Sequence, residues 1–309
     1  MSYDLIGDIH GHAETLEALL LKLEYEKRDG VYSHPSRRVI FLGDFIDGGP
    51  EQRRTIEIVR PMIDSGRALA VLGNHEFNAV AFATPDDNGG YLRPRSDKNL
   101  AQHDAFLNQY PADSRDYKNV IGWFRQLPLW LDLGGIRVIH ACWDRKLIQR
   151  IAKAYDGPNL SDELLAKASD KGRWEYNAVE TLLKGKEIPL PQGHHFHDRY
   201  GTQRHHIRIR WWDRHETTYR GKFLGSKSWE THIPDDPIDL EHEITYGHSE
   251  PPVFLGHYWL EGTPKTLEDN VACLDYSVGR PGGKLVSYRW DGESRLDQKS
   301  FVSVNRVEP

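Results

Sequence analysis

The sequence predicts an α/β protein, and three observations support this prediction. Short apolar strands alternate with amphipathic helices through the N-terminal half of the chain. The 309 residues are enough to bury a sizeable core, and a charged fraction of 28% suits a globular protein. No apolar run reaches the ~18 residues that a membrane-spanning helix needs. We therefore expect largely parallel strands covered by helices.

The apolar periodicity places the expected elements in order along the chain. In the N-terminal half it predicts strands at 3–6, 38–42 and 68–72, and helices at 14–23, around 56–63 and at 74–82. Residues 84–95 are rich in Gly, Pro and Asp and are typical of a loop. Further elements are a helix at 117–127 and strands at 129–133, 137–139, 253–255, 271–274 and 284–290.

Each of the first three predicted strands ends in glycine followed at once by a carboxylate or amide. The runs are Gly-Asp-Ile-His-Gly at 7–11, Gly-Asp-Phe-Ile-Asp at 43–47 and Gly-Asn-His-Glu at 73–76. In an α/β sheet the carboxyl ends of the strands open into the crevice where ligands bind. Asp8 and His10 lie two residues apart, so extended backbone puts both side chains on one side, where they can bind one cation.

Two later runs complete a pattern that resembles a known superfamily. They are Arg-Val-Ile-His-Ala at 137–141 and Phe-Leu-Gly-His at 254–257. In this order the five runs resemble the motif blocks of the calcineurin-like metallophosphoesterases. The resemblance implies a metal-dependent phosphoester hydrolase with an α/β fold, a β-sandwich flanked by helices. It also implies a single domain over 1–309 with an inserted cap-like segment at about 150–245.

The resemblance implies a role for each matching residue. The implied ligands of two divalent cations are Asp8, His10 and Asp44 for the first, and Asp44, Asn74, His140 and His257 for the second. His75 resembles the family's general acid, and Asp47 resembles the carboxylate that orients it. Two cations about 3.5–4 Å apart acidify a bridging water, so that a hydroxide can attack phosphorus at neutral pH. His34 and His103 have no strand-end context, and we expect both at the surface.

The form of the third run indicates the branch that holds Ser/Thr protein phosphatases and symmetrical diadenosine tetraphosphatases. The tail, with Gly-His-Tyr-Trp-Leu-Glu-Gly at 256–262 and Gly-Gly-Lys-Leu at 282–285, is similar to that of the tetraphosphatases. One position departs from the family, because Gly48 stands where an arginine usually grips the phosphate. Losing that guanidinium should cost about 1.5–3 kcal/mol of binding unless another arginine replaces it. Arg53 and Arg54 are near enough in sequence to be considered, although a solvated helix face explains both.

Residues 193–220 are densely basic and aromatic. The alternation Ile207-Arg208-Ile209-Arg210 predicts a half-buried strand with both arginines on one face. It resembles the family's strand that bears a phosphate-binding arginine, so Arg208 and Arg210 are candidate substrate ligands. The alternative is that these arginines belong to a solvated strand face.

The net charge and the cysteine content limit which binding partners and which cellular compartment we expect. With 40 basic and 46 acidic residues the net charge is −6, which argues against nucleic acid or an anionic membrane as the partner. We expect a phosphorylated small molecule, a dinucleoside polyphosphate or a phosphoprotein. Two cysteines do not make a disulfide framework, and a reducing cytoplasm is the simplest location.

The nature of the metals and one alternative function stay open. Carboxylate, imidazole and amide donors suit Mn, our expectation, but also Fe, Zn, Ni, Co or Mg. The alternative function is a catalytically weak metal-binding module that regulates a partner. Retention of His75 and Asp47 argues against it, because a scaffold does not require a proton donor. A nuclease ranks third on account of the acidic charge.

Overall fold

The main sheet is built around the strand that opens the chain. The structure is a computed structural model that describes residues 2–197, 201–239, 244 and 246–308. In the main sheet three strands run parallel to one another, and a long C-terminal strand pairs antiparallel with the first of them. The order is β14 (Asp275–Tyr276), β15 (Lys284–Trp290), β1 (Ser2–Ile6), β4 (Arg37–Phe41) and β5 (Ala68–Ala70), with β16 (Phe301–Asn305) also on β15.

A second sheet packs against the first. Its order is β13 (Val271–Cys273), β12 (Val253–Leu255), β7 (Arg137–Ile139) and β6 (Trp130–Asp132), with β12 parallel to both of its neighbours. Apolar side chains of both sheets form one buried cluster, in which the rings of Phe254 and Tyr288 are 5.1 Å apart. The expected β-sandwich is therefore confirmed.

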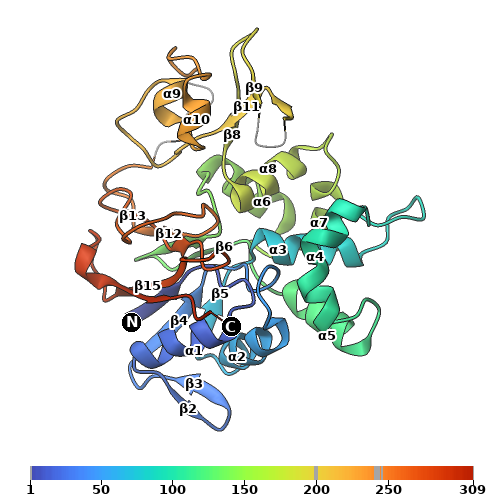
Figure 1. Cartoon of the computed structure of the whole chain (residues 1–309), viewed down its shortest axis with the longest axis vertical. Coiled ribbons are helices and arrows are strands. Elements are labelled where there is room, and N and C mark those ends of the chain that lie inside the picture. The colour runs from blue at the N-terminus through green and yellow to red at the C-terminus, as the bar shows by residue number, and fades with distance from the viewer. Residues whose placement is uncertain (1, 198–200, 240–243, 245, 309) are drawn as a thin grey trace.

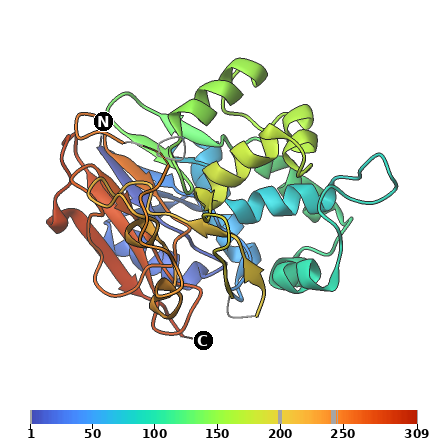
Figure 2. The same ribbon diagram turned by 90° about the horizontal axis from the view of Figure 1, so that it is seen from above.

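Helices cover the outer faces of this sandwich (Figures 1 and 2). Helices α1 and α2 pack on the main sheet, and the hairpin of β2 and β3 extends beyond them. These elements and those that follow are α1 (Ala13–Lys22), β2 (Glu26–Arg28), β3 (Val31–Ser33), α2 (Gln52–Asp64), α3 (Asn74–Ala83), α4 (Asp97–Gln109) and α5 (Arg115–Phe124). Helix α4 was not predicted, although Ser96 caps it by accepting a hydrogen bond from the N–H of Asn99.

The stretch between β7 and β12 contains two kinds of structure. Its helices α6 (Arg145–Tyr155), α7 (Asp162–Ala168) and α8 (Trp174–Lys184) join the main core. The next elements have a small apolar cluster of their own and stand above these helices in Figure 1. They are β8 (Glu187–Pro189), β9 (Phe196–His197), β10 (Gln203–Arg204), β11 (His206–Arg208), α9 (Tyr219–Lys222) and α10 (Lys227–Glu230). The division of the chain at about 150 and 245 stays a prediction.

The predicted strands and helices of the N-terminal half are present, with ends that move by a few residues. The basic segment 193–220 includes residues 198–200, which lie outside the described residues. A 3₁₀ turn, η2 (Gln298–Ser300), precedes β16. Among the helices of the described ranges, none has the length and apolar character to cross a membrane.

The shared core between the sheets predicts a large cost for truncating Phe254. The side chain is 0% exposed, so Phe254→Ala should lower the free energy of unfolding by about 3–5 kcal/mol, the usual range for a buried phenylalanine. The control is Leu21→Ala on α1, whose side chain is 62% exposed and whose loss should change stability by less than about 0.5 kcal/mol. Urea unfolding measures both, and equal effects would contradict a packed interface between the sheets.

Candidate metal centre

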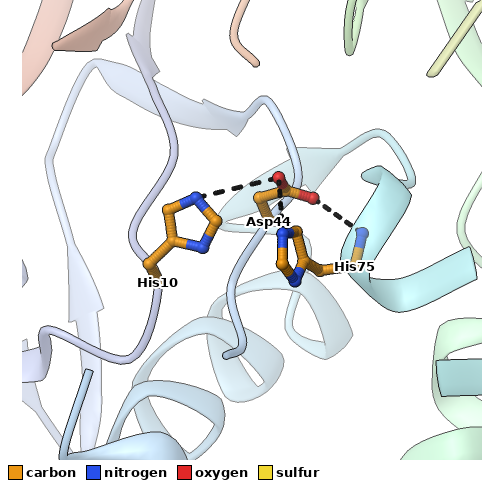
Figure 3. Close-up of side chains that lie close together, drawn as sticks. All are labelled: His10, Asp44 and His75. Carbon is orange, nitrogen blue, oxygen red and sulfur yellow. Dashed lines mark hydrogen bonds and ion pairs between the residues drawn. The ribbon is translucent and has the colours of Figure 1, made fainter. Parts of the chain in front are cut away.

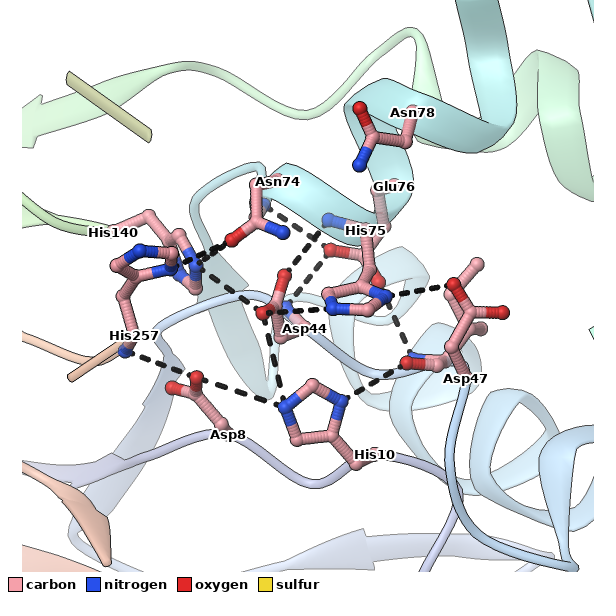
Figure 4. A network of polar contacts seen from close by, with 12 residues as sticks. Asp8, His10, Asp44, Asp47, Asn74, His75, Glu76, Asn78, His140 and His257 are labelled. Carbon is pink, nitrogen blue, oxygen red and sulfur yellow. Dashed lines mark hydrogen bonds and ion pairs between the residues drawn. The ribbon is translucent and has the colours of Figure 1, made fainter. Parts of the chain in front are cut away.

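Three parallel strands of the main sheet deliver polar side chains to one edge. Asp8 follows β1, Asp44 follows β4, and Asn74 begins α3 just beyond β5. Because parallel strands point the same way, their carboxyl ends meet at one edge of the sheet. Figure 4 shows these side chains pointing toward one another. The structure thus brings these three side chains together at the strand ends, and their role as metal ligands stays a prediction.

The second sheet brings two histidines to the same place. His140 follows β7 and His257 follows β12, two adjacent parallel strands. His140 Nε2 lies 3.3 Å from Asp44 Oδ2 and 3.0 Å from Asn74 Oδ1. His257 Nδ1 lies 2.7 Å from the same amide oxygen of Asn74. The cluster is thus formed where the edges of two sheets face each other.

The backbone turns sharply at the residues that carry these side chains. His10, Asp44 and His257 have φ values of 48°, 50° and 71°, in the left-handed region that residues other than glycine rarely adopt. At Gly73 a Cβ atom would collide with the Asp44 carboxylate, and at Gly256 with that of Asp8. Backbone strain and close approach of this kind concentrate at functional sites.

The side chain of Glu76 holds the turn at Asp44 in place, a role that the sequence pattern did not reveal. Its buried carboxylate accepts hydrogen bonds from the N–H groups of Asp44 (2.8 Å), Phe45 (2.8 Å) and Gly73 (3.1 Å). Burial and the nearby charge of Asp44 raise the pKa of Glu76 to about 7. The N–H groups satisfied by Glu76 come from two separate turns, so this side chain fixes them relative to each other.

Two groups of side chains have donor atoms close enough to hold a cation, and they share Asp44. One is His10, Asp44 and His75 (Figure 3), and the other is Asp44, His140 and His257. Asp8 lies beside the first group, with Oδ2 3.9 Å from His10 Nε2. Asp8 Oδ1 and His10 Nε2 are buried without a hydrogen-bond partner in the described ranges. Buried polar atoms normally have partners, and oxygen and nitrogen donors of these types fit divalent cations.

Burial and the neighbouring charges shift the pKa values of the side chains in the cluster. Burial disfavours the charge of Asp44, but His140 and His75 outweigh it and hold the pKa of Asp44 well below its usual value. Burial likewise opposes the charge of His140, yet Asp44 raises the pKa of His140 to about 10. Burial and Asp275 raise the pKa of Asp8 well above its usual value. Metal ligands bind in their deprotonated forms, so a cation here would compete with the protons that these shifts favour on Asp8 and His140.

His75 lies beside the cluster and is held from both sides. Its backbone N–H donates to Asp44 Oδ1 at 3.0 Å, and its Nδ1 lies 2.7 Å from Asp47 Oδ2. Burial lowers the basicity of the ring, but Asp44 and Asp47 outweigh this effect and raise the pKa of His75 to about 9. The expectation that His103 is a surface residue was wrong: it is buried on α4, and its Nδ1 lies 2.8 Å from Asp47 Oδ1. The sequence gives no sign of this contact, because the two residues meet only through the packing of α4.

The two candidate arginines make different contacts. Arg208 Nη1 lies 3.4 Å from His257 Nε2, and its Nη2 donates to Glu187 at 3.1 Å. Arg210 instead contacts the carbonyl oxygen of Gly221 and the carboxylate of Asp213. Arg208 therefore borders the cluster, whereas the contacts of Arg210 lie within the segment that follows α8.

The arginines close in sequence to Gly48 bind acidic residues elsewhere. Arg53 pairs with Asp116, and Arg54 pairs with Glu17 and Glu51. Both therefore match the expectation of a solvated helix face. Gly48 itself has φ +88°, so any side chain there would be strained.

Comparison with known proteins places this arrangement in a family. A family model described as calcineurin-like phosphoesterase matches residues 1–272 of the 309. The chain belongs to the calcineurin-like phosphoesterase family. A protein serine/threonine phosphatase from Saccharomyces cerevisiae shares the fold of this phosphoesterase, with a TM-score of 0.52 and 15% identity over 100% of this chain and 81% of that one.

Curated relatives of this phosphoesterase bear the name bis(5'-nucleosyl)-tetraphosphatase PrpE, asymmetrical. The protein from Oceanobacillus iheyensis is 32% identical over 149 residues, which are 46% of this chain and 55% of the relative. The protein from Halalkalibacterium halodurans is 42% identical over 76 residues, 24% of this chain and 31% of the relative. The chain thus matches about half or less of the length of these relatives.

The hydrogen bonds of Glu76 predict that its replacement by glutamine lowers the free energy of unfolding. Glu76→Gln keeps one acceptor oxygen and turns an NH₂ group toward backbone N–H groups. The variant should lose about 2–4 kcal/mol of unfolding free energy, since each buried unsatisfied group costs about 1–3 kcal/mol. The measurement is urea unfolding in the presence of a chelator. Glu163→Gln, at an exposed pair with Lys167, is the matched control and should change stability by less than about 0.5 kcal/mol. A Glu76→Gln variant as stable as this control would contradict the bracing role.

Proposed function

We propose that this protein is a metal-dependent hydrolase of nucleoside polyphosphates. The observation that carries the proposal is the cluster of carboxylate, imidazole and amide donors around Asp44, with His75 and Asp47 beside it. Membership of the phosphoesterase family and the tetraphosphatase names of the PrpE relatives support the reaction class. We also propose a cytoplasmic location, because the chain has only two cysteines and therefore no disulfide framework.

The residues would hold two divalent cations through a shared carboxylate. We assign Asp8, His10 and Asp44 to one cation, and Asp44, Asn74, His140 and His257 to the other. Mn²⁺ is the proposed ion, because the mixed set of carboxylate, imidazole and amide donors suits it. When bound, two such cations supply Lewis acidity and a nucleophilic water at neutral pH.

His75 and Asp47 would handle the proton of the leaving group. With Nδ1 held by Asp47, the remaining ring nitrogen of His75 faces the cluster, 3.9 Å from Asp44 Oδ2. Burial opposes the charge, but Asp44 and Asp47 raise the pKa of His75 to about 9 in the metal-free site. The Asp47 contact would favour the protonated ring that donates to the leaving oxygen. Such acid catalysis typically contributes about 10²–10⁴-fold.

Two adjoining grooves that share Arg208, the residue that borders the cluster, favour an extended anionic substrate. They measure about 930 Å³ and about 490 Å³, and Arg208 lines both. The larger one also contains basic side chains and aromatic rings. They are Lys98, Lys184, Arg204, His205, His206, Tyr176, Phe196, Phe223 and Trp229, against the acidic Glu180 and Glu187. Several phosphates followed by a base would match this lining, since cations bind phosphate and aromatic rings stack on bases.

The first test is a turnover panel with diadenosine tetraphosphate, p-nitrophenyl phosphate and a phosphopeptide. We expect the highest kcat/KM for the dinucleotide, loss of turnover on chelation and recovery with Mn²⁺, because the nucleophile depends on the cations. Metal analysis should find about two ions per chain in the parent and fewer in Asp44→Ala. Product analysis separates symmetrical cleavage, which the tail motifs favour, from the asymmetrical cleavage in the relatives' name. Undiminished turnover after exhaustive chelation would refute the proposal, and metal uptake without turnover would favour the regulatory module.

The second test concerns the phosphate-binding role of Arg208. Arg208→Ala should lower kcat/KM for diadenosine tetraphosphate by about tenfold or more, because a hydrogen bond to a charged group contributes about 1.5–3 kcal/mol. Arg208→Lys should recover only part of this loss, since an ammonium group cannot bond two oxygens at once. Arg210→Ala, two residues beyond Arg208 and just past the end of β11, is the comparison. An equal loss in both alanine variants would extend the role to Arg210, and no loss in either would remove both arginines from it.

A further inference from the structure

The side chain of His103 is buried among aromatic rings, where a polar imidazole is costly unless it makes a hydrogen bond. It lies on α4 with 5% of its surface exposed, between the rings of Phe106 and Phe82 at 4.9 and 5.4 Å. Its Nδ1 lies 2.8 Å from Asp47 Oδ1, whereas its Nε2 has no hydrogen-bond partner in the described part of the chain. A proton on Nε2 would be buried and unsatisfied, whereas a proton on Nδ1 is accepted by Asp47 Oδ1, so the geometry assigns the tautomer with its proton on Nδ1. In that form His103 is a hydrogen-bond donor with a fixed direction.

The contact with His103 completes the fixation of Asp47. The two carboxylate oxygens are divided between two histidines, Oδ1 for His103 and Oδ2 for His75. The backbone N–H of Asp47 donates to Gln52 Oε1 at 2.8 Å. Since the aromatic rings also prevent His103 from turning, the Asp47 carboxylate cannot rotate without breaking a hydrogen bond to a buried group. Its Oδ2 must therefore face His75.

We propose that His103 is a positioning residue, which locks the Asp47 carboxylate in the orientation that holds His75 for proton donation. The inference rests on the proposed function, because it assigns a partner to the proposed general acid. His103 contacts the carboxylate oxygen of Asp47 that His75 does not, and in the described residues no hydrogen bond or ring contact links it to the cluster. Its effect on the reaction is transmitted through one carboxylate.

A pair of near-isosteric variants tests the hydrogen bond separately from the packing. His103→Asn keeps an N–H donor at the position of Nδ1, and His103→Leu puts a methyl group there. Both lose the aromatic ring, so they share the packing defect. The readout is kcat for phenyl phosphate, a poor leaving group, against kcat for p-nitrophenyl phosphate, a good one, with metal content measured alongside. Only the poor leaving group depends strongly on protonation.

We expect His103→Leu to lower kcat for phenyl phosphate about tenfold more than kcat for p-nitrophenyl phosphate, with unchanged metal content. His103→Asn should restore the parental ratio. Phe106→Leu controls for a loosened core, and it should lower thermal stability without changing the ratio. The proposal is overturned if His103→Leu slows both esters equally, or if Asn and Leu behave alike. If the parent hydrolyses neither ester nor the dinucleotide, the proposed function fails, and this inference fails with it.

Discussion

The buried charge of Asp44 is the constraint on which the rest of the site depends. Burying a carboxylate is expensive unless charges and hydrogen-bond donors surround it. Here Oδ1 accepts from the N–H of His75 at the start of α3, and Oδ2 lies 3.3 Å from His140 and 3.8 Å from His10. These partners come from β5–α3, from the second sheet and from the turn after β1. The sandwich therefore has to bring two sheet edges together for the charge to be tolerated.

The same constraint explains why so much of the surrounding structure is strained or polar. A second carboxylate, Glu76, lies below the turn and satisfies its N–H groups, although Asp44 and Glu76 repel each other. Left-handed backbone at His10 and Asp44 costs further free energy. Sites of this kind lower the folding stability but hold their side chains in place beforehand. The side chains then need not be rearranged when a cation or substrate binds.

The sequence predicted the parts of the site that follow from strand periodicity. Asp8, Asp44 and Asn74 stand directly after apolar strands, and neighbouring parallel strands must end at a common edge. His103 and Glu76 could not be assigned in the same way, because their roles depend on how α4 and α3 pack. Helix α4 itself was missed, since within it only His103 and Phe106 are buried and the apolar stripe is too thin to show a period. The small core of the segment after α8 was hidden for a related reason, because its strands are only two or three residues long.

The loop around Gly48 shows why phosphate recognition would move to the other side of the cluster. The N–H of Gly49 donates to the carbonyl oxygen of His10, and a Cβ atom at Gly49 would collide with the backbone of the 10–11 turn. The loop is thus packed closely against the turn that carries His10, and its left-handed glycine at 48 cannot hold a long side chain without strain. In the proposed function a guanidinium for the phosphate would come from elsewhere, and Arg208 of the small β8–β11 sheet lies 3.4 Å from His257. Because Arg208 also lines both grooves, this one side chain would contact both the reacting phosphate and the rest of the substrate. A substrate long enough to fill the grooves would gain more from this arrangement than a small monoester.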